Sequence, residues 1–182
     1  MQDSKLQFKI QKYKTLESTN LKAKELAKSG AEPWTIILTE EQAGGYGRKG
    51  TAWLSLKGGL YFSIILPKSN IDDLQTLTIL AAFICAKTIK ENFNLEPFIK
   101  LPNDVWVNGK KVAGILTENV IGKDVKISVM GIGFNTNIEK FPEDLENIAT
   151  SLKIELGREV DNKKILEQII TGLKEQLKTI SE

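Results

Sequence analysis

The sequence predicts an α+β fold in which a mainly antiparallel sheet is flanked by helices, and two observations lead to this prediction. Hairpin signals outnumber strand–helix–strand crossovers along the chain, as expected of an antiparallel sheet. A long, mostly apolar helix is predicted over residues 72–93, and such a helix should lie against a sheet. No repeat, low-complexity stretch or linker divides the 182 residues, so we expect a single domain over residues 1–182.

The strands expected before this helix are short and bounded by turn residues. They cover residues 6–13, 34–41, 53–56 and 60–67. Between the first two, residues 18–20 offer an N-cap to a helix that ends near Gly30. The second strand has the apolar run of a buried strand and leads into a loop with four glycines over residues 42–50.

Asn108-Gly109 is the strongest short hairpin signal in the chain, and strand patterns flank it on both sides. A two-residue turn there predicts four opposite pairs: Val107 with Lys110, Trp106 with Lys111, Val105 with Val112, and Asp104 with Ala113. Side chains alternate across a sheet, so the pair of Val105 and Val112 should face the core. The other face should then carry Asp104, Trp106, Lys111 and Ala113.

An acid and a lysine on that second face indicate a ligand site. Diagonal neighbours on adjacent strands lie about 7 Å apart at the backbone, which one ligand can bridge. The small, apolar run over residues 113–115 lies beside Asp104 and Lys111, and a glycine inside a strand often marks the close approach of a ligand. An exposed cross-strand ion pair on a solvated sheet surface is the alternative.

The remaining chain is predicted to form one more strand and two helices. A turn at Lys123-Asp124 leads into a strand over residues 125–134, and a short helix follows near residues 148–156. An amphipathic helix starts at residue 161. Its apolar stripe consists of Ile165, Leu166, Ile169, Ile170, Leu173 and Leu177.

Composition and charge exclude several classes of function. With 25 basic and 23 acidic side chains, the formal charge of +2 is too small to indicate a nucleic acid or an anionic membrane as partner. The chain has no histidine, which excludes Ser-His-Asp triads, Cys-His dyads and imidazole metal ligands. The single cysteine, Cys85, suits a reducing cytoplasm and is expected to pack in the core. Because no signal peptide or membrane-spanning run is visible, we expect a cytoplasmic protein without a membrane partner.

The glycine-rich loop around Arg48 indicates an anion-binding site. Gly45, Gly47 and Gly50 match the dinucleotide-binding pattern by letter, but neither the required helix nor the acidic ribose ligand follows. A Walker loop is excluded because Thr51 lacks the preceding lysine. Arg48, one of only two arginines, adds a planar fork suited to a carboxylate or a phosphate, beside backbone N–H groups. A surface loop whose glycines only make turns is the alternative.

Five motifs follow one another along residues 14–137. They are Glu17-Ser18-Thr19-Asn20, Gln42-x-x-Gly45-x-Gly47-Arg48-x-Gly50-x-x-Trp53, Lys100-Leu101-Pro102-Asn103-Asp104, Lys111-Val112-Ala113-Gly114-Ile115-Leu116-x-Glu118, and Gly131-Ile132-Gly133-x-Asn135. In this order and at these spacings the sequence resembles the catalytic domain of biotin–protein ligases. Several ordered motifs are far more specific than any one of them. The resemblance implies the biotin–lipoate ligase fold, which is similar to class II aminoacyl-tRNA synthetases.

The resemblance also implies a two-step reaction. Biotin and MgATP give biotinyl-5′-adenylate and pyrophosphate, and a lysine of a biotin carboxyl carrier protein, a subunit of acetyl-CoA carboxylase, then attacks the adenylate. By position, the residues implied to contact biotin are Ser18, Thr19, Gln42, Gly45, Tyr46 and Gly114. Those implied to contact the nucleotide are Gly47, Arg48, Trp53, Asn103, Lys111 and Asn135.

Three of the residues are implied to be catalytic. Arg48 would hold the carboxylate and the adenylate phosphate, and Lys111 would contact the acyl-phosphate region. Asp104 would organise the Mg²⁺ side and accept the proton of the carrier lysine. The absence of histidine fits this chemistry, because carboxylate attack on a phosphate needs positioning and charge neutralisation.

The sequence departs from the family pattern in two residues and in length. Leu101 stands where the family usually has tryptophan, and Tyr46 stands where a basic residue is common. Many relatives carry an N-terminal DNA-binding winged helix, and most carry a small C-terminal domain. We expect neither here, and therefore no DNA partner and no repressor role. A monomer or a homodimer is compatible with the pattern.

Two other functions stay open from the sequence. A lipoate or octanoyl ligase or transferase shares the fold and the lysine, although a transferase of that kind is expected to place a cysteine near its site. A non-catalytic sensor that binds biotin or its adenylate is the alternative from another class.

Overall fold

A seven-stranded sheet organises the structure, a computed structural model that describes residues 8–67, 73–121 and 126–181. Its strands follow the order β1-β2-β3-β7-β6-β5-β4, and β1 and β2 are the one parallel pair among the described strands. The strands are β1 (Lys9–Leu16), β2 (Thr35–Gln42), β3 (Leu60–Ile65), β4 (Phe98–Lys100), β5 (Asp104–Val107), β6 (Lys110–Ile121) and β7 (Lys126–Phe134). The predicted α+β fold with a mainly antiparallel sheet is confirmed.

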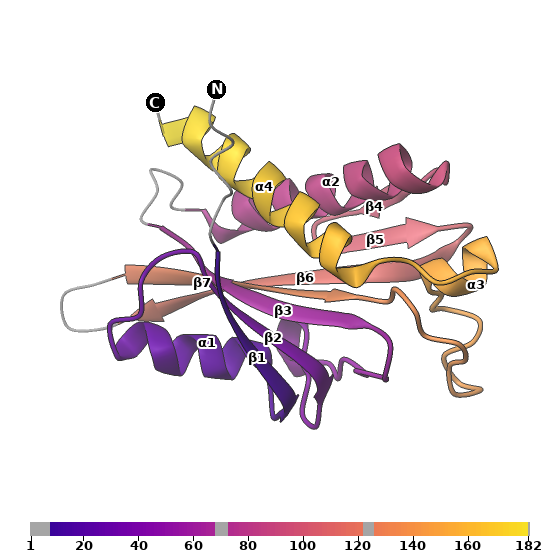
Figure 1. The fold of residues 1–182 in the computed structure, drawn as a ribbon, viewed down its shortest axis with the longest axis horizontal. Helices are drawn as coiled ribbons and strands as arrows, with labels where there is room; N and C mark the ends of the chain where they lie inside the picture. The colour runs from indigo at the N-terminus through magenta and orange to yellow at the C-terminus, as the bar shows by residue number, and fades with distance from the viewer. Residues whose placement is uncertain (1–7, 68–72, 122–125, 182) are drawn as a thin grey trace.

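Helices cover both faces of the sheet (Figure 1). They are α1 (Thr19–Lys28), α2 (Leu74–Phe93), α3 (Leu152–Leu156) and α4 (Asn162–Ser181). On one face lies α1, whereas α2 and α4 lie on the other. Successive residues of the central strands serve the two layers: Ile36 belongs to the core under α2 and α4, and Ile37 to the smaller core under α1. The sheet is therefore buried between two helical layers at its centre.

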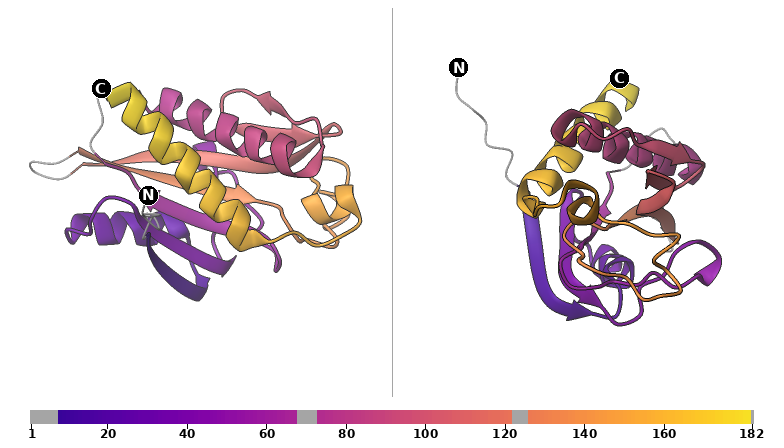
Figure 2. Two further views of the ribbon diagram at one scale, coloured as in Figure 1. Left: turned by 45° about the horizontal axis from the view of Figure 1, so that its top comes forward. Right: turned by 90° about the vertical axis from the view of Figure 1, so that its right-hand side faces the viewer.

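The predicted apolar stripe holds the C-terminal helix α4 in place. All six stripe residues are buried: Ile165, Leu166, Ile169, Ile170, Leu173 and Leu177. Figure 2 shows α4 crossing the helical layer next to α2, with which it shares the main core. The long apolar helix predicted over residues 72–93 is confirmed as α2, which Asp73 caps with its carboxylate.

The turn of the β5–β6 hairpin forms as predicted. Asn108 and Gly109 have φ angles of 49° and 78°, the left-handed values that a type I′ turn requires. Next to the turn, Trp106 pairs with Lys111. The signal of Asn108-Gly109 was therefore sufficient to place this turn.

Beyond the turn, a β-bulge changes the pairing by one residue. Val105 lies opposite Ala113 and Asp104 opposite Gly114, so the predicted pairs of Val105 with Val112 and of Asp104 with Ala113 are wrong. The physical reason is that Val112 is an extra residue in β6, which shifts all residues after it to the other face. Val105, Val112 and Ala113 all lie fully buried in the main core. Gly114, and not Ala113, therefore lies opposite Asp104 on the face that carries Lys111.

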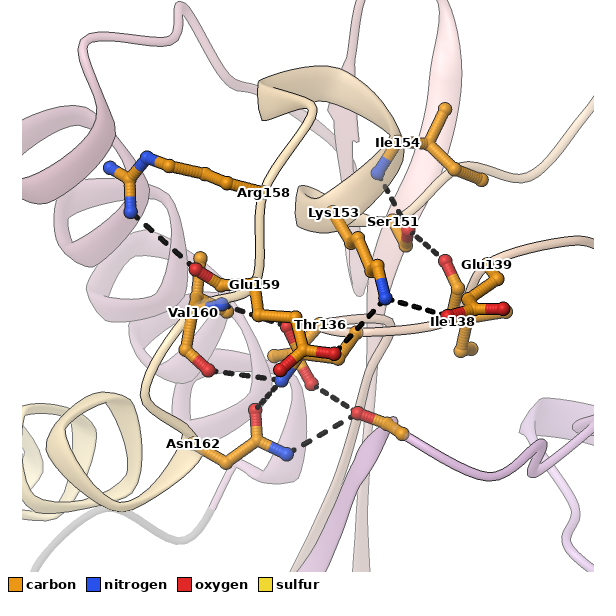
Figure 3. Close-up of polar contacts among 12 residues, drawn as sticks. Thr136, Ile138, Glu139, Ser151, Lys153, Ile154, Arg158, Glu159, Val160 and Asn162 are labelled. Atoms are coloured by element: carbon orange, nitrogen blue, oxygen red, sulfur yellow. Dashed lines mark hydrogen bonds and ion pairs between the residues drawn. The ribbon is translucent and has the colours of Figure 1, made fainter.

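Polar contacts fasten the C-terminal part of the chain to the end of the sheet (Figure 3). Ser151 donates its hydroxyl to the carbonyl of Ile138 at 2.6 Å. The ammonium of Lys153 lies 2.7 Å from the Glu139 carboxylate and 3.0 Å from that of Glu159. The segment after β7 is thereby held against α3, which fixes its position relative to the sheet.

Two elements differ between the prediction and the structure, and two further predictions fall on residues that the structure does not describe. The strand expected over residues 53–56 is wrong, because that stretch has a single isolated bridge, between Ser55 and Gln42. The three-residue edge strand β4 was not predicted. The expected turn at Lys123-Asp124 and the first residues of the strand over 6–13 lie outside the described residues. Within the described ranges, no helix has the length and apolarity to cross a membrane.

Truncating a buried residue of α4 should destabilise the whole domain. Ile169 is fully buried between α4 and the main core, so Ile169→Ala should lower the free energy of unfolding by about 3 kcal/mol through lost burial and a new cavity. Urea unfolding followed by circular dichroism measures this. The control Ile154→Ala, at a residue 46% exposed in α3, should cost less than about 1 kcal/mol. Equal losses in the two variants would contradict the assignment of α4 to the core.

Candidate active site

A cavity of about 350 Å³ lies on the α1 side of the sheet. The start of α1, the glycine-rich loop, the bulged hairpin and β7 all contribute to its wall. Its lining residues are Ser18, Thr19, Asn20, Gln42, Tyr46, Gly47, Arg48, Lys49, Thr51, Ala52, Trp53, Asn103, Asp104, Lys111, Gly114, Ile115, Leu116, Gly131, Ile132 and Gly133. Motifs from Ser18 to Gly133 therefore meet around one space.

The start of α1 presents buried polar side chains to this cavity. Ser18 caps the helix, and its hydroxyl accepts from the Leu21 N–H at 3.5 Å. The Thr19 N–H and hydroxyl both donate to the amide oxygen of Gln42, at 2.8 and 3.1 Å. The amide nitrogen of Gln42 in turn donates to Ser55 at 2.8 Å. Because each partner is held by another, these groups are preorganised to bind a polar ligand.

We call residues 43–55 the flap, because this segment folds back on itself beside the cavity. The Trp53 N–H donates to the Gly45 carbonyl at 2.9 Å, and the Gly47 N–H donates to the Thr51 carbonyl at 2.7 Å. At its tip a short 3₁₀ turn, Arg48–Gly50, turns the chain. The glycine-rich loop is thus an ordered hairpin-like segment, not a loop whose glycines only make turns.

Trp53 lies over two glycines of the sheet. Gly114 and Gly133 are paired across β6 and β7, and the Trp53 ring covers both of them. A Cβ at Gly114 would lie 2.7 Å from the ring, and one at Gly133 would clash more severely. The indole N–H is buried without a hydrogen-bond partner in the described part of the chain. Only glycine at these two positions lets the indole form one wall of the cavity.

Lys111 and Asp104 form an ion pair within the cavity. The ammonium lies 2.7 Å from a carboxylate oxygen, and both side chains are about three-quarters buried. The ammonium also lies 5.0 Å from the centre of the Trp53 ring, within the range of a cation–π contact. The prediction that the acid and the lysine share one face is confirmed. Their partial burial argues against a solvated surface pair.

The backbone of the bulge is held by distant parts of the chain. The Lys111 N–H donates to the Ile148 carbonyl at 2.9 Å, and the Lys111 carbonyl accepts from the Thr150 N–H at 2.9 Å. The Val112 carbonyl accepts from the Asn135 N–H at 2.8 Å. The segment before α3 and the end of β7 therefore position the lysine.

Arg48 lies at the flap tip and lines the cavity. Its guanidinium donates to the Asn103 amide oxygen at 3.4 Å. Asn103 lies next to Asp104 and donates to the Ile115 carbonyl at 3.3 Å, which holds the amide in place. Arg48 is exposed, so its guanidinium can meet an anion that enters from solvent.

A charged cluster joins the flap to α1 and β6. Glu118 accepts from the Tyr46 hydroxyl and from the Asn20 amide, each at 2.8 Å, and from the Lys24 ammonium at 3.0 Å. Burial alone would raise the pKa of the Glu118 carboxyl, but the three donors outweigh it, and the pKa is lowered. Burial likewise opposes the charge of Lys24, whose pKa is nevertheless raised by Tyr46 and Glu118.

The structure brings most of the predicted site residues together, with two exceptions. Gly45 and Asn135 lie outside the lining: Gly45 is paired within the flap, and Asn135 is buried behind the bulge. Three residues received no role in the site from the sequence: Asn20 and Glu118, which belong to the quoted motifs, and Lys24, which does not. Asn20 and Lys24 are four apart on α1 and hence on one helix face, a spacing that could have indicated a pair.

The donor set of the cavity suits magnesium only as part of a nucleotide complex. Among the described residues no group of three or more acidic or cysteine side chains could hold a metal ion. Asp104, beside the Asn103 amide, offers a single carboxylate. Magnesium is usually bound by one or two carboxylates together with substrate phosphates, so this set fits that mode.

Comparison with protein families matches residues 12–135 to the biotin/lipoate A/B protein ligase family. The chain belongs to this family. The Bacillus subtilis bifunctional ligase/repressor BirA is 38% identical over 160 residues, which cover 85% of this chain and 49% of that protein. The biotin–[acetyl-CoA-carboxylase] ligase of Paracoccus denitrificans is 31% identical over 83% of this chain and 65% of its own length. The chain thus spans about half the length of its BirA relative.

Solved structures of the family share the fold described above. The biotin protein ligase from Aquifex aeolicus, in complex with biotin and ATP, superposes with a TM-score of 0.85 and 31% identity. The similarity covers 94% of this chain and 71% of that chain. The resemblance inferred from the five sequence motifs, and the fold that it implied, are therefore confirmed.

Acid should weaken the contribution of Glu118 to stability. Its carboxyl has a lowered pKa in the folded state, so it stabilises the fold above the ordinary pKa of 4.5 and loses this effect as the pH falls through the folded value. Glu118→Gln should therefore cost about 1 kcal/mol near neutral pH, and the difference from wild type should shrink below the ordinary pKa. Urea unfolding at a series of pH values measures it.

A matched control distinguishes the stability contributed by a partly buried ion pair from that contributed by an exposed one. Glu139 is also ion-paired, 2.7 Å from Lys153, but its side chain is 78% exposed, so Glu139→Gln should change stability less at every pH. A pH-independent difference between Glu118→Gln and wild type would contradict the charged cluster.

Proposed function

We propose that this chain is an ATP-dependent biotin–protein ligase. It joins biotin to ATP to form biotinyl-5′-adenylate and pyrophosphate, and it transfers the biotin to a lysine of a biotin carboxyl carrier protein. The observation that carries the proposal is the convergence of Arg48, Lys111 and Asp104 on one cavity. It is supported by 31% identity to a ligase whose structure contains biotin and ATP.

The polar end of the cavity suits the biotin head. Ser18 and Thr19 offer buried hydroxyls at the start of α1, and Gln42 at the end of β2 accepts from Thr19. Gly114 leaves the sheet without a side chain under the Trp53 ring. Tyr46 would cover the head from the flap, with backbone groups of Gly45 nearby. A ureido-like group that both donates and accepts hydrogen bonds fits this mixed set.

The charged end suits the reacting groups. In the first step a carboxylate oxygen of biotin attacks the α-phosphorus of ATP, and pyrophosphate leaves. Arg48 would hold the carboxylate and the α-phosphate, and Lys111 would neutralise charge that develops between them. Gly47, Asn103 and Trp53 would border the nucleotide.

The second step needs a proton acceptor. The amine of the carrier lysine attacks the acyl carbon. The bond from that carbon to the phosphate oxygen breaks, and AMP leaves with the electron pair of that bond. Asp104 would accept the proton that the amine loses, since its carboxylate lies in the cavity beside Lys111. Asn135 would support the adenine side from behind the bulge.

Magnesium would be held by Asp104 together with the phosphates of ATP. When bound, it neutralises phosphate charge and polarises the phosphorus for attack. The residues of this chain contribute the orientation of the two substrates and the exclusion of water.

Cys85 argues against a cysteine-dependent transferase. It is fully buried in α2, on the opposite side of the sheet from the cavity, and burial raises the pKa of its thiol to about 12. A thiol of this kind is neither reachable nor ionised near neutral pH. A lipoate ligase of the same fold would not need the cysteine, so the acid substrate must be tested directly.

The decisive assay measures pyrophosphate release from ATP with either biotin or lipoate. We expect release with biotin and little with lipoate. Release with lipoate alone would favour the lipoate ligase. Binding of biotin without any release would favour the sensor.

Removing the cavity lysine should mainly impair adenylation. Lys111→Ala is expected to slow single-turnover pyrophosphate release by about 100-fold, because charge neutralisation at the phosphate is lost. Lys110→Ala is the matched control, since the Lys110 ammonium bonds to the Glu146 carbonyl and not to the cavity. A wild-type rate in Lys111→Ala would rule out this role.

Removing the flap arginine should let the activated intermediate escape. Arg48→Gly is expected to biotinylate lysines of an added bystander protein about tenfold more than wild type, because the adenylate loses its charge-assisted clamp. Arg158→Gly provides the control, since the other arginine bonds only weakly to the Glu159 carbonyl at 3.5 Å. Equal bystander labelling in all three proteins would argue against a clamp at Arg48.

A further inference from the structure

We propose that Tyr46 is a positioning residue whose hydroxyl fastens the flap to the body of the domain. It acts through Glu118 and Lys24, and it sets how long the activated intermediate stays in the cavity. The retention part rests on the proposed ligase function. The fastening itself stands on the contacts of the ligand-free protein.

The Tyr46 hydroxyl is bound from two sides at once. It donates to Glu118 at 2.8 Å and accepts from the Lys24 ammonium at 3.0 Å, while Lys24 and Glu118 are themselves 3.0 Å apart. The three groups therefore close a triangle. Both bonds of the hydroxyl involve a charged partner, and such bonds are stronger than neutral ones.

The partners of Tyr46 belong to rigid elements. Lys24 projects from the middle of α1, and Glu118 from β6, where it pairs with β7. Asn20 adds a third fixed point, because its amide donates both to Glu118 at 2.8 Å and to the Leu116 carbonyl at 3.3 Å. The flap is thus attached to a cluster that does not depend on the flap for its own geometry.

In the described part of the chain, the flap has few other attachments near its tip. Its base is held by the Ala43 and Gly44 N–H groups, which donate to Leu16 and Glu17 carbonyls at 2.9 Å. Between the base and the exposed tip, Tyr46 supplies the side-chain bonds to α1 and β6, and Arg48 supplies only a 3.4 Å bond to Asn103. Arg48 is two residues from Tyr46, so the position of the guanidinium depends on this fastening.

Tyrosine suits this place in a way that neither phenylalanine nor a cation does. A phenol donates one hydrogen bond and accepts another, which matches a carboxylate on one side and an ammonium on the other. A lysine or arginine would place a second cation against Lys24. Half-burial also raises the pKa of Tyr46, against the opposing effect of Lys24, so the hydroxyl keeps its proton near neutral pH.

Native-state proteolysis tests the fastening without any ligand. Trypsin cleaves after Arg48 and Lys49 at the flap tip, and cleavage tracks the opening of the segment. Tyr46→Phe should be cut at these two bonds about tenfold faster than wild type, since a bond to a charged group is lost. Tyr13→Phe is the matched control, because its hydroxyl bonds to Gln11 on the edge strand β1, away from the flap. Equal cleavage of all three proteins would overturn the proposal.

A second variant tests whether the contacts act as a unit. Lys24→Met should also speed cleavage, and the double variant with Tyr46→Phe should be no faster than the faster single variant. Fully multiplicative effects would show two independent attachments and would overturn the triangle.

Retention of the intermediate is the readout that a merely structural tyrosine would not change. In Tyr46→Phe, biotinyl-5′-adenylate formed on the enzyme should dissociate about tenfold faster into a competing trap. KM for biotin should rise as well. Faster flap cleavage without faster dissociation would overturn the retention role. Absence of pyrophosphate release in wild type would overturn the proposed function and with it that role, whereas the cleavage rates would decide the fastening separately.

Discussion

The β-bulge at Val112 is the constraint on which the site depends. One extra residue in β6 turns Lys111 and Gly114 to the same face of the sheet, although in a regular strand residues three apart face opposite sides. The same shift places Asp104 opposite Gly114, so that acid, lysine and glycine surface come together. Because a bulge leaves backbone groups of β6 without partners in β5, the segment before α3 and Asn135 supply them. The C-terminal part of the chain therefore shapes a site to which it contributes no lining side chain.

One face of the sheet carries most of the apolar core, and the other face carries the candidate site. The face under α2 and α4 carries the large apolar core, and it also encloses Cys85. The face under α1 has a smaller apolar cluster, and beside it lies the cavity, which polar and apolar groups line together. Burial on the first face supplies the free energy that allows polar groups to be held, partly desolvated, on the second.

Polar groups on the second face form one connected chain. It runs from Ser55 through Gln42 and Thr19 to Ser63, and from there through Asn20 to Glu118. Gly131 is needed beside it, because a Cβ there would collide with the Asn20 amide. Connected hydrogen bonds reinforce one another in a low dielectric, so the polar end of the cavity and the cluster that binds the flap belong to a common network. Chemistry based on positioning and charge neutralisation needs such rigidity more than it needs a histidine.

Short-range patterns were sufficient for much of this protein. The α4 stripe, the N-cap within residues 18–20 and the turn at Asn108-Gly109 depend on residues close in sequence, and each was predicted correctly. The spacing of the motifs was also enough to indicate the family. These features could be read because neighbouring residues alone determine helical periodicity, capping and left-handed turns.

Tertiary structure decided two features that local sequence patterns do not encode: the face on which each residue of β6 lies and the contacts of Tyr46. The bulge moved Gly114 to the cavity and Ala113 to the core, where both Val112 and Ala113 are fully buried. The fastening of Tyr46 joins residues from a loop, a helix and a strand that are 22 and 72 positions away in the chain. The sequence by itself determined most of the elements and the residue types that they carry. Only the folded chain decided which face each group occupies, because that choice depends on contacts between segments far apart in the sequence.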